Sequence, residues 1–291
     1  MSSSRPTALV VDSGACLPAS LGEATWVSVV PMSIEVDGRV LRDGIDIGSD
    51  ELYRRLGQPG PLPTSSSPSP GDYLKAFRRI TARDIICLAI PERFSMMGRS
   101  ARVAAEMLRS EQPEKRVEVV DTGTAAGGYT LVAEAAAAAC GAGLGLDRVL
   151  PYTREVAGTA RVIAALETMR FLVRSGRVPA LAGRGGDLLK VRPVFSFSGG
   201  DVRRLGLVRG TRRAMREVAE QLRQQTAPDG MVRLAVFCGD AQAAVPELAR
   251  RLEALFGERP LERLSLNPVI ALHTGPGLIG AASIADLPLP V

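Results

Sequence analysis

The sequence predicts an α/β protein, and three observations lead to this fold class. Apolar strands alternate with helices through the first half of the chain, which is typical of a mostly parallel sheet covered on both faces. Turn signals in the second half predict antiparallel hairpins and therefore a mixed sheet. The 291 residues also exceed the usual size of one domain. We expect an N-terminal α/β domain over residues 1–148 and a C-terminal α/β domain over residues 149–291.

Each element of the first half has a local signal. The run TALVVDSG, residues 7–14, is apolar and ends in polar residues, as expected for a first parallel strand whose carboxyl end meets a ligand. Asp37-Gly38 divides an alternating segment into a hairpin. Ser49 is expected to cap a helix. The further elements expected before residue 145 are helices at 71–80, from near Ser95 to 111, and at 128–143, with strands at 84–90 and 116–121.

The second half has the same alternation with more hairpins. Residues 143–157 are expected to connect the two domains, and Gly199-Gly200 marks a hairpin within residues 190–208. Helices are predicted at 211–225 and 245–257, with a strand at 232–240 between them. The apolar run VIAL, residues 269–272, is interpreted as a strand that ends at His273.

Charge and cysteine usage argue against two classes of protein, nucleic-acid binders and zinc proteins. The net charge of +5 comes from 36 basic and 31 acidic residues spread along the chain, unlike the concentrated basic face of a nucleic-acid binder. Four separated cysteines and one histidine match no zinc spacing. The sequence has neither a signal-peptide h-region nor a run long enough to span a bilayer, so we expect a cytoplasmic protein without membrane insertion, cofactor or metal.

A hydroxyl-rich loop precedes the helix expected at 71–80. Ser69 and Pro70 fit the cap and first turn of that helix. Capping needs only one hydroxyl, so the others are available to bind an anion near the helix dipole. These are Thr64, Ser65, Ser66 and Ser67.

Ser95 lies in a similar position after the next strand, so the two loops are expected to meet at one edge of the sheet. Met96 and Met97 follow it and suit either a helix core or the wall of a hydrocarbon site. His273 is the only histidine, and by default such a residue is structural. A serine hydrolase would need it as the base for Ser95 or Ser13, but the chain has no GxSxG motif.

Eight segments resemble, in order, the motifs of the DegV family over essentially the whole chain. They are VVDSGACLP, VPMSIEVDGRVLRDGIDI, PTSSSPSPGDY, RFSMMGRSA, VEVVDTG, MRFLVRSGRV, LLKVRPVF and HTGPGLIG. The resemblance implies two α/β domains, with a ligand tunnel at and between them that holds a long-chain fatty acid such as palmitate, stearate or oleate. It also implies a non-catalytic subunit that presents the acyl carboxylate to a separate ATP-dependent fatty acid kinase, which forms acyl phosphate for phospholipid metabolism.

Carried over by position, the resemblance assigns the carboxylate to Ser65, Ser66, Ser95, Arg177 and His273. The surrounding tunnel wall would include Asp12, Ser13, Met96, Met97, Gly275 and Gly277. The chain departs from the family pattern at Met96, Met97, Gly98 and Arg99 after the serine, at Ser175 in the Gly-Gly-Arg turn, and at Ser67 in place of a glutamine. A methionine beside the carboxylate is expected to shorten or redirect the tunnel.

Two further interpretations remain open. The alternatives to a fatty-acid carrier are a serine-dependent hydrolase and a binder of another small anionic ligand in the same cleft. A cluster of arginines is either a solvated surface or a docking surface for an acidic patch of the kinase. These arginines are Arg203, Arg204, Arg209, Arg212 and Arg213.

Overall fold

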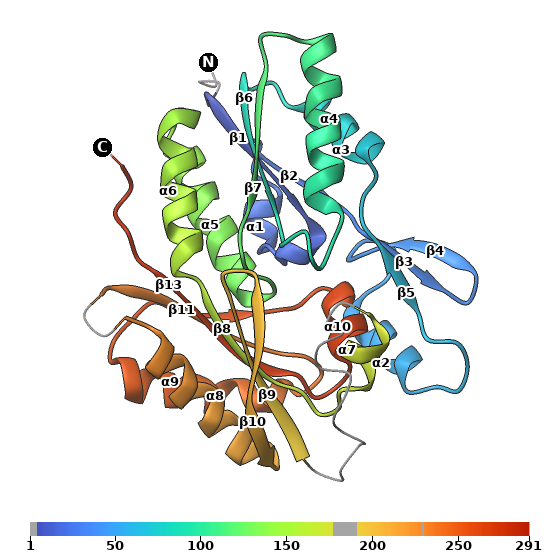
Figure 1. The fold of residues 1–291 in the computed structure, drawn as a ribbon, viewed down its shortest axis with the longest axis vertical. Coiled ribbons are helices and arrows are strands. Elements are labelled where there is room, and N and C mark those ends of the chain that lie inside the picture. Colours follow the sequence, from blue (N-terminus) through green and yellow to red (C-terminus); the bar gives the residue numbers. More distant parts are fainter. Residues whose placement is uncertain (1–4, 177–190, 228–229, 291) are drawn as a thin grey trace.

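The first sheet is parallel throughout, in the order β2–β1–β6–β7 (Figure 1). The computed structural model describes residues 5–176, 191–227 and 230–290. β1 is buried along its whole length because helices cover both faces of the sheet, which matches its continuous apolar run. The strands are β1 (Thr7–Asp12), β2 (Val27–Val30), β6 (Asp84–Ala89) and β7 (Arg116–Asp121).

Two helices lie on each face of this sheet. Alternate residues of β1 point to opposite faces, so Val10 joins the core of one helix pair, while Leu9 and Val11 join the core of the other. Val10 packs on the side of α3 (Pro70–Arg79) and α4 (Met97–Glu111), and its neighbours pack on the side of α5 (Gly127–Gly141) and α6 (Leu146–Thr159).

The second sheet has six strands in the order β10–β9–β8–β13–β11–β12 and is mixed, as expected. Only β11 and β12 pair in parallel, and the other neighbours are antiparallel. The strands are β8 (Arg161–Ala165), β9 (Val191–Ser198), β10 (Asp201–Arg209), β11 (Val232–Cys238), β12 (Leu261–Leu264) and β13 (Ile279–Ala285). Its outer face is covered by α8 (Thr211–Gln225), η3 (Gln242–Ala244) and α9 (Val245–Phe256).

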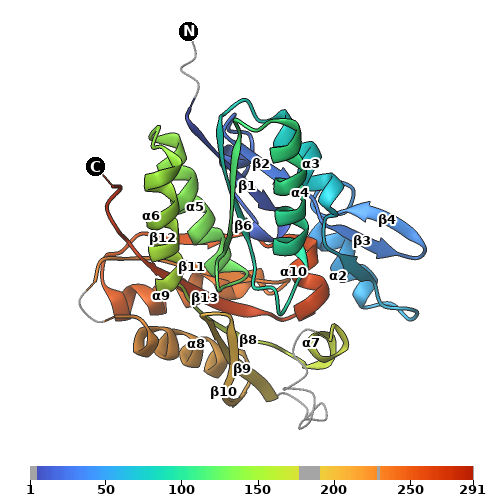
Figure 2. The ribbon, with the colours of Figure 1, turned by 45° about the horizontal axis from the view of Figure 1, so that its top comes forward.

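The helix α5 lies between the two sheets, as Figures 1 and 2 show from two directions. It is buried on nearly all sides, which its alanine-rich sequence permits. At its start, a Cβ on Gly127 would lie 2.5 Å from the Phe237 ring, and one on Gly128 would lie 2.6 Å from Val162. Small residues at this end therefore allow α5 to approach the second sheet closely.

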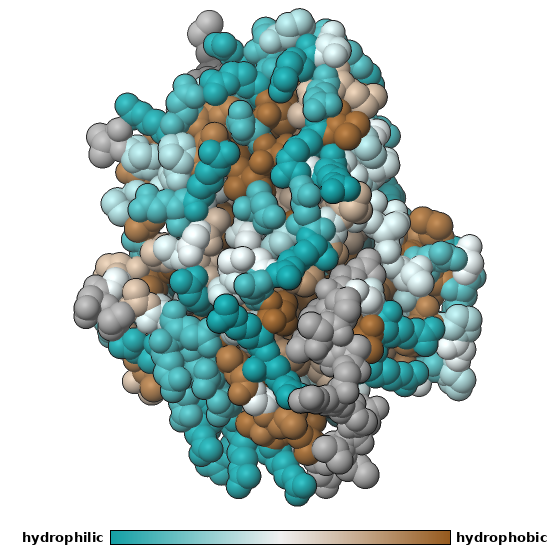
Figure 3. All heavy atoms as spheres, viewed as in Figure 1, coloured by the Kyte–Doolittle hydropathy of each residue, from teal (hydrophilic) through white to brown (hydrophobic). Residues whose placement is uncertain are grey.

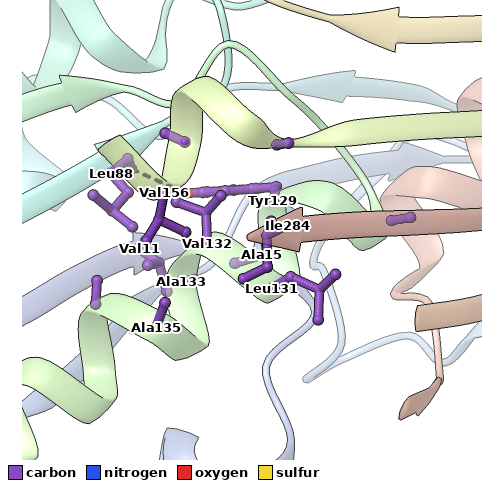
Figure 4. Close-up of a cluster of buried hydrophobic side chains, with 14 of the residues drawn as sticks. Val11, Ala15, Leu88, Tyr129, Leu131, Val132, Ala133, Ala135, Val156 and Ile284 are labelled. Carbon is purple, nitrogen blue, oxygen red and sulfur yellow. Dashed lines mark hydrogen bonds between the residues drawn. The ribbon is translucent and has the colours of Figure 1, made fainter. Parts of the chain in front are cut away.

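Tyr129 of α5 is central to the shared core (Figure 4). Its ring lies among aliphatic side chains that include Val11, Val132 and Val156, and its hydroxyl reaches the Leu88 carbonyl of β6 at 2.9 Å. The layers are thus helix, sheet, helix, sheet, helix, with one core joining the two sheets through α5 and α6.

A small third sheet projects beside these layers in the order β4–β3–β5. The expected hairpin is confirmed: Asp37 and Gly38 both have positive φ, 51° and 76°, as a type I′ turn requires. Its strands are β3 (Ser33–Val36), β4 (Arg39–Arg42) and β5 (Thr64–Ser66). The remaining short elements of the first half are η1 (Ser13–Ala15), α1 (Ala19–Gly22) and α2 (Ser49–Leu56).

The predicted start of α3 is confirmed. The Ser69 hydroxyl accepts a hydrogen bond from Asp72 N at 3.2 Å, and the Asp72 carboxylate accepts one from Ser69 N at 2.8 Å. Pro70 occupies the first turn. This reciprocal capping box explains how the hydroxyl-rich loop ends and leaves Ser65 and Ser67 for other contacts.

Two local predictions are wrong. The run VIAL is not a strand but lies in the helix α10 (Pro268–Thr274), because Pro268 begins the helix and Gly275, with φ of 71°, ends it. Ser49 does not cap α2. The cap position is Gly48, and the Ser49 hydroxyl instead donates to the Leu266 carbonyl at 2.7 Å. A run of four apolar residues fits either a strand or a buried helix, so the pattern of VIAL alone does not decide between them. The contact of Ser49 is with a residue far away in the chain, which a local capping pattern does not predict.

The boundary expected between residues 148 and 149 falls within α6, the last helix before β8. The domain boundary therefore stays a prediction. The residues on its two sides share one hydrophobic core. One further short helix, α7 (Arg170–Arg174), follows β8 and lies near α10 (Figure 1).

Candidate functional site

An apolar cavity lies where the carboxyl edge of the first sheet meets the second sheet. Residues that follow β1 and β6, and residues that precede α5, face side chains of β8, β9 and α10 across it. Its empty volume is about 1220 Å³, including parts open to solvent. Most of the residues that line the cavity are apolar, which suits the hydrocarbon part of a ligand. Its apolar walls include Ile90, Val162, Leu166, Phe195, Phe197 and Phe237.

A hairpin closes one side of the cavity. Between β9 and β10, Gly200 N donates to the carbonyl of Gly123, which follows β7 of the first sheet, at 2.8 Å. The Phe94 and Phe197 rings, with centroids 5.1 Å apart, bring the loop after β6 against β9. Arg93 donates to the Gly200 carbonyl at 2.8 Å. These contacts hold the aromatic wall in place between the two sheets.

Two pairs of polar side chains lie at the cavity, and three of the four, Ser67, Ser95 and His273, interrupt its apolar lining. Ser65 Oγ lies 2.9 Å from His273 Nε2, and Ser67 Oγ lies 2.8 Å from Ser95 Oγ. Ser95 Oγ also accepts a hydrogen bond from Met97 N at 3.3 Å, at the start of α4. The two hydroxyl-bearing loops and the imidazole therefore meet, as the sequence predicts for Ser65, Ser95 and His273.

The pleat of β5 decides which hydroxyls take part. Alternate residues of a strand point to opposite sides, so Ser65 and Ser67 face α10 and the loop after β6, whereas Ser66 is exposed. The structure does not bring Ser66 to the polar pairs, and the position that carries a hydroxyl there is Ser67. The prediction of Ser66 is off by one residue, and a shift of one residue along a strand moves a side chain to the opposite face.

Long-range hydrogen bonds position α10 and with it His273. The Asp43 carboxylate accepts from Val269 N at 2.8 Å, in the first turn of the helix. Asn267 Nδ2 donates to the Ser13 carbonyl at 2.7 Å. Burial raises the pKa of Asp43. Sequence reasoning missed Asp43 and Asn267, because nothing near them in the chain indicates these partners.

Ser13 therefore contributes to the site through its backbone. Its hydroxyl accepts from Met32 N at 3.0 Å, which ties the end of β1 to the segment before β3. Ser13 is buried and does not line the cavity, whereas its neighbours Asp12 and Gly14 do. The hydroxyl adjacent to His273 Nε2 belongs to Ser65, so neither Ser13 nor Ser95 is placed as the nucleophile of a serine–histidine pair.

Asp12 is a fully buried carboxyl in the cavity wall. Its Oδ1 accepts from Gly14 N at 2.7 Å, and its Oδ2 lies 2.9 Å from Tyr129 Oη. When the single Tyr129 proton is donated to the Leu88 carbonyl, only a protonated Asp12 completes the second contact. Burial raises the pKa of Asp12 to about 6, which favours this protonated form.

The two methionines after Ser95 differ in position. Met97 is buried and lines the cavity, whereas Met96 has 52% of its surface exposed. Met97 therefore shapes the cavity beside Ser95, and Met96 does not line it. Of these two departures from the family pattern, the one at Met97 is therefore the one that changes the shape of the cavity.

Gly275 and Gly277 are required by packing behind the histidine. Both have positive φ, 71° and 75°. A Cβ on Gly275 would overlap the Phe171 ring of α7, and one on Gly277 would overlap the Glu167 side chain. The close approach that these glycines permit is thus to α7 and its preceding loop, and neither glycine lines the cavity.

The arginine-rich segment lies on β10 and the start of α8. All five arginines are exposed: Arg203, Arg204, Arg209, Arg212 and Arg213. Figure 3 shows hydrophilic side chains over much of this face, with apolar patches between them. Arg177, the remaining predicted carboxylate ligand, lies outside the described residues.

In residues 5–176, 191–227 and 230–290, no cluster of three His, Cys, Asp or Glu side chains is arranged to hold a metal ion. In the same residues, no helix combines the length and apolarity needed to cross a bilayer.

Known proteins resemble the chain over nearly its whole length. A family model described as an uncharacterised protein of the DegV family matches residues 6–286. A DegV domain-containing protein of Streptomyces coelicolor is 32% identical over 281 residues, covering 95% of this chain and 98% of the relative.

Solved structures share the fold. One, described as fatty acid binding of a DegV family protein from Thermus thermophilus, has a TM-score of 0.85 and 29% identity, covering 96% of this chain and 99% of that one. The Streptococcus pneumoniae fatty acid kinase B3 protein, loaded with linoleic acid, has a TM-score of 0.86 and 21% identity over 96% and 99% of the two chains. The chain with this cavity and these paired hydroxyls belongs to the DegV family.

Proposed function

We propose that the protein binds a long-chain fatty acid, with its hydrocarbon in the apolar cavity and its carboxylate at Ser65, Ser67, Ser95 and His273. The observation that carries this proposal is the combination of a long apolar lining with two hydrogen-bonded polar pairs. The Thermus thermophilus relative, described as fatty acid binding, supports the same ligand class.

The energetics favour this division between tail and head. Burying hydrocarbon contributes about 0.8 kcal/mol per methylene, so a sixteen-carbon chain gains on the order of 10 kcal/mol before entropic losses. A carboxylate taken from water needs hydrogen bonds, and each charge-assisted bond contributes roughly 1.5–3 kcal/mol. The tail therefore supplies most of the affinity, and the hydroxyls and imidazole fix the position of the head group.

A second part of the proposal concerns a partner. The protein would present the bound carboxylate to a separate ATP-dependent kinase and would not itself catalyse the transfer. A carboxylate oxygen would bond to the γ-phosphorus of ATP as the bond between that phosphorus and the ADP oxygen breaks. The pneumococcal protein with the same fold, named as a fatty acid kinase component, supports this role.

The exposed arginines of β10 and α8 suit docking to an acidic surface of such a kinase. Reversing the charge with Arg203→Glu and Arg204→Glu together should slow acyl phosphate formation in a reconstituted reaction, and added salt should slow the wild-type reaction as well. An unchanged rate at low salt would show that these arginines are only a solvated surface.

The alternative of a serine-dependent hydrolase now has a defined candidate, because Ser65 Oγ is next to His273 Nε2. A fluorophosphonate probe would label Ser65 in a hydrolase. We expect no labelling, since the pair is proposed to bind a carboxylate. Labelling of Ser65 that is lost in His273→Ala would favour the hydrolase.

The experiment that tests the fatty-acid proposal compares palmitate with methyl palmitate by calorimetric titration. The two ligands share a tail, but the ester has no charged carboxylate to accept the hydrogen bonds. We expect palmitate to bind at least tenfold more tightly, about one charge-assisted bond. Equal affinities would contradict the polar head-group site, and no binding of either would contradict a fatty-acid site.

A further inference from the structure

Asp12 is a buried carboxyl in the cavity wall that the proposed function does not use. It ends β1, and among the described residues that line the cavity only Asp12 and His273 have titratable side chains. The described lining also contains no arginine or lysine. A negative charge on Asp12 would therefore face an apolar space with no such cation to neutralise it, and burial makes that charge costly.

The hydrogen bonds of Asp12 are compatible with both of its protonation states. Gly14 N donates to Oδ1 at 2.7 Å, and either a carboxylate or a carboxylic acid accepts that bond. Tyr129 Oη lies 2.9 Å from Asp12 Oδ2 and 2.9 Å from the Leu88 carbonyl oxygen. The phenol donates to an ionised Asp12, or it donates to Leu88 and accepts the proton of a neutral Asp12. The site therefore gains or loses one proton without leaving Oδ2 unpaired.

The other titratable groups that interact with Asp12 come from several elements packed around it. They are Tyr129 of α5, Tyr73 of α3, Cys87 of β6, Cys16 after η1 and Asp43 after β4. Burial raises the pKa of both phenols and both thiols, that of Cys16 to about 12, so these four groups stay neutral near pH 7. The acidic Asp43 adds to the effect of burial, and the pKa of Asp12 rises to about 6.

A bound fatty acid brings a second negative charge into the same cavity. β1 and β6 are neighbouring parallel strands, so Asp12 at the end of β1 and Ser95 in the loop after β6 lie at the same edge of the sheet. Ser95 and His273 of the proposed carboxylate site line the cavity together with Asp12. A like charge in surroundings poor in water favours the neutral form of a carboxyl. Because coupling between two sites is reciprocal, a neutral Asp12 in turn favours binding of the anion.

We propose that the protein takes up a proton at Asp12 when it binds a fatty-acid anion, so that binding is coupled to pH. The inference rests on the proposed function and deepens it, because both concern the same cavity. The proton neutralises Asp12 and not the ligand, so the ligand carboxylate still accepts hydrogen bonds from the hydroxyls and the imidazole. The fatty acid therefore binds more tightly as the pH falls through the neutral range.

The first test counts protons. Calorimetric titrations at pH 7 in two buffers of different ionisation enthalpy give the number of protons taken up on binding. A rise of one unit or more in the Asp12 pKa from about 6 predicts an uptake of roughly 0.4 proton or more with palmitate. Methyl palmitate carries no charge and should cause none. No uptake with palmitate, or an equal uptake with the ester, would overturn the coupling, and this count needs no variant.

The second test assigns the proton to Asp12. The Kd of palmitate for the wild type should rise at least about threefold from pH 6 to pH 8, and Asp12→Asn should lose most of this rise, although it keeps His273. At pH 8 the variant should bind palmitate at least about threefold more tightly than the wild type, because it lacks the negative charge. Damage to the fold would not produce a gain in affinity.

Glu134→Gln is the matched control. Glu134 is a buried carboxyl of α5 that bonds to Arg233 and does not line the cavity, so its replacement should leave the proton count with palmitate unchanged. If Asp12→Asn keeps the pH dependence and the proton count of the wild type, the proton is not bound at Asp12. A wild-type protein that binds no palmitate at any pH would instead contradict the proposed function.

Discussion

Ser65 and His273 are separated by 208 positions in the chain, yet Ser65 Oγ lies 2.9 Å from His273 Nε2. One belongs to β5 of the small third sheet, and the other to α10 beside the second sheet. The start of α10 is fixed by two hydrogen bonds, from Val269 N to the Asp43 carboxylate and from Asn267 Nδ2 to the Ser13 carbonyl. The proposed carboxylate site is therefore an assembly of separate elements, and its geometry depends on tertiary structure.

Replacing the imidazole should weaken ligand binding. His273→Ala removes a donor to the proposed carboxylate, and we expect the Kd of palmitate to rise about tenfold or more, the equivalent of one charge-assisted hydrogen bond. Calorimetric titration measures the change. Ser66→Ala is the matched control, because Ser66 is exposed on the other side of β5. An equal loss in both variants would contradict the placement of the carboxylate.

Filling part of the apolar cavity should weaken the binding of the hydrocarbon tail. Ala164 of β8 lines the cavity, and Ala164→Phe would occupy space that several methylenes need. Displacing three methylenes costs about 2.4 kcal/mol, so palmitate binding should fall on the order of 50-fold. Octanoate, with a shorter tail, should lose less. If both acids lose the same factor, the tail does not reach this wall.

Asp12 should make stability depend on pH. Burial raises its pKa to about 6, above the value of about 4 for an unfolded chain. Between these values the folded state keeps a proton that the unfolded state releases, so the free energy of unfolding falls as pH rises from about 4 to 6. The Asp12 contribution to this fall is about 3 kcal/mol.

Asp12→Asn tests this directly, since asparagine has the shape of a protonated aspartate and keeps an acceptor for Gly14 N. Urea unfolding measured from pH 4 to pH 7 should show a smaller decline for the variant than for the wild type. Parallel curves for the two proteins would mean that Asp12 does not hold this proton.

Gly275→Ala should destabilise the region behind the histidine. The residue has a φ of 71°, and an added Cβ would overlap Phe171. Strain of about 1–2 kcal/mol and overpacking of about 1–3 kcal/mol together predict a loss of about 2–5 kcal/mol in the free energy of unfolding. Gly143→Ala, with a φ of 79° and open space around it, separates the two effects. Equal losses would show that contact with Phe171 is unimportant.

Local sequence signals predicted much of the fold. The apolar run of β1, the Asp37-Gly38 turn and the Ser69 cap are decided by neighbouring residues, so they are visible in the chain. The short run VIAL was ambiguous, because four apolar residues fit either a strand or a buried helix. Only Pro268 and Gly275, at its two ends, favour the helix that forms.

The candidate site was predictable only in part. The sequence indicated the loops that carry Ser65 and Ser95 and singled out His273. It could not fix the phase of β5, which turns Ser67 inward and Ser66 outward. The support that Asp43 gives to α10 depends on a contact across 226 positions, which no local pattern encodes.

The central claim is that the cavity holds a fatty acid, and native mass spectrometry of the protein purified from cells tests it most directly. We predict a bound mass equal to that of a long-chain fatty acid, which solvent extraction releases and which His273→Ala retains less well. Protein that is consistently free of lipid, and that acquires none when palmitate or oleate is added, would contradict the account.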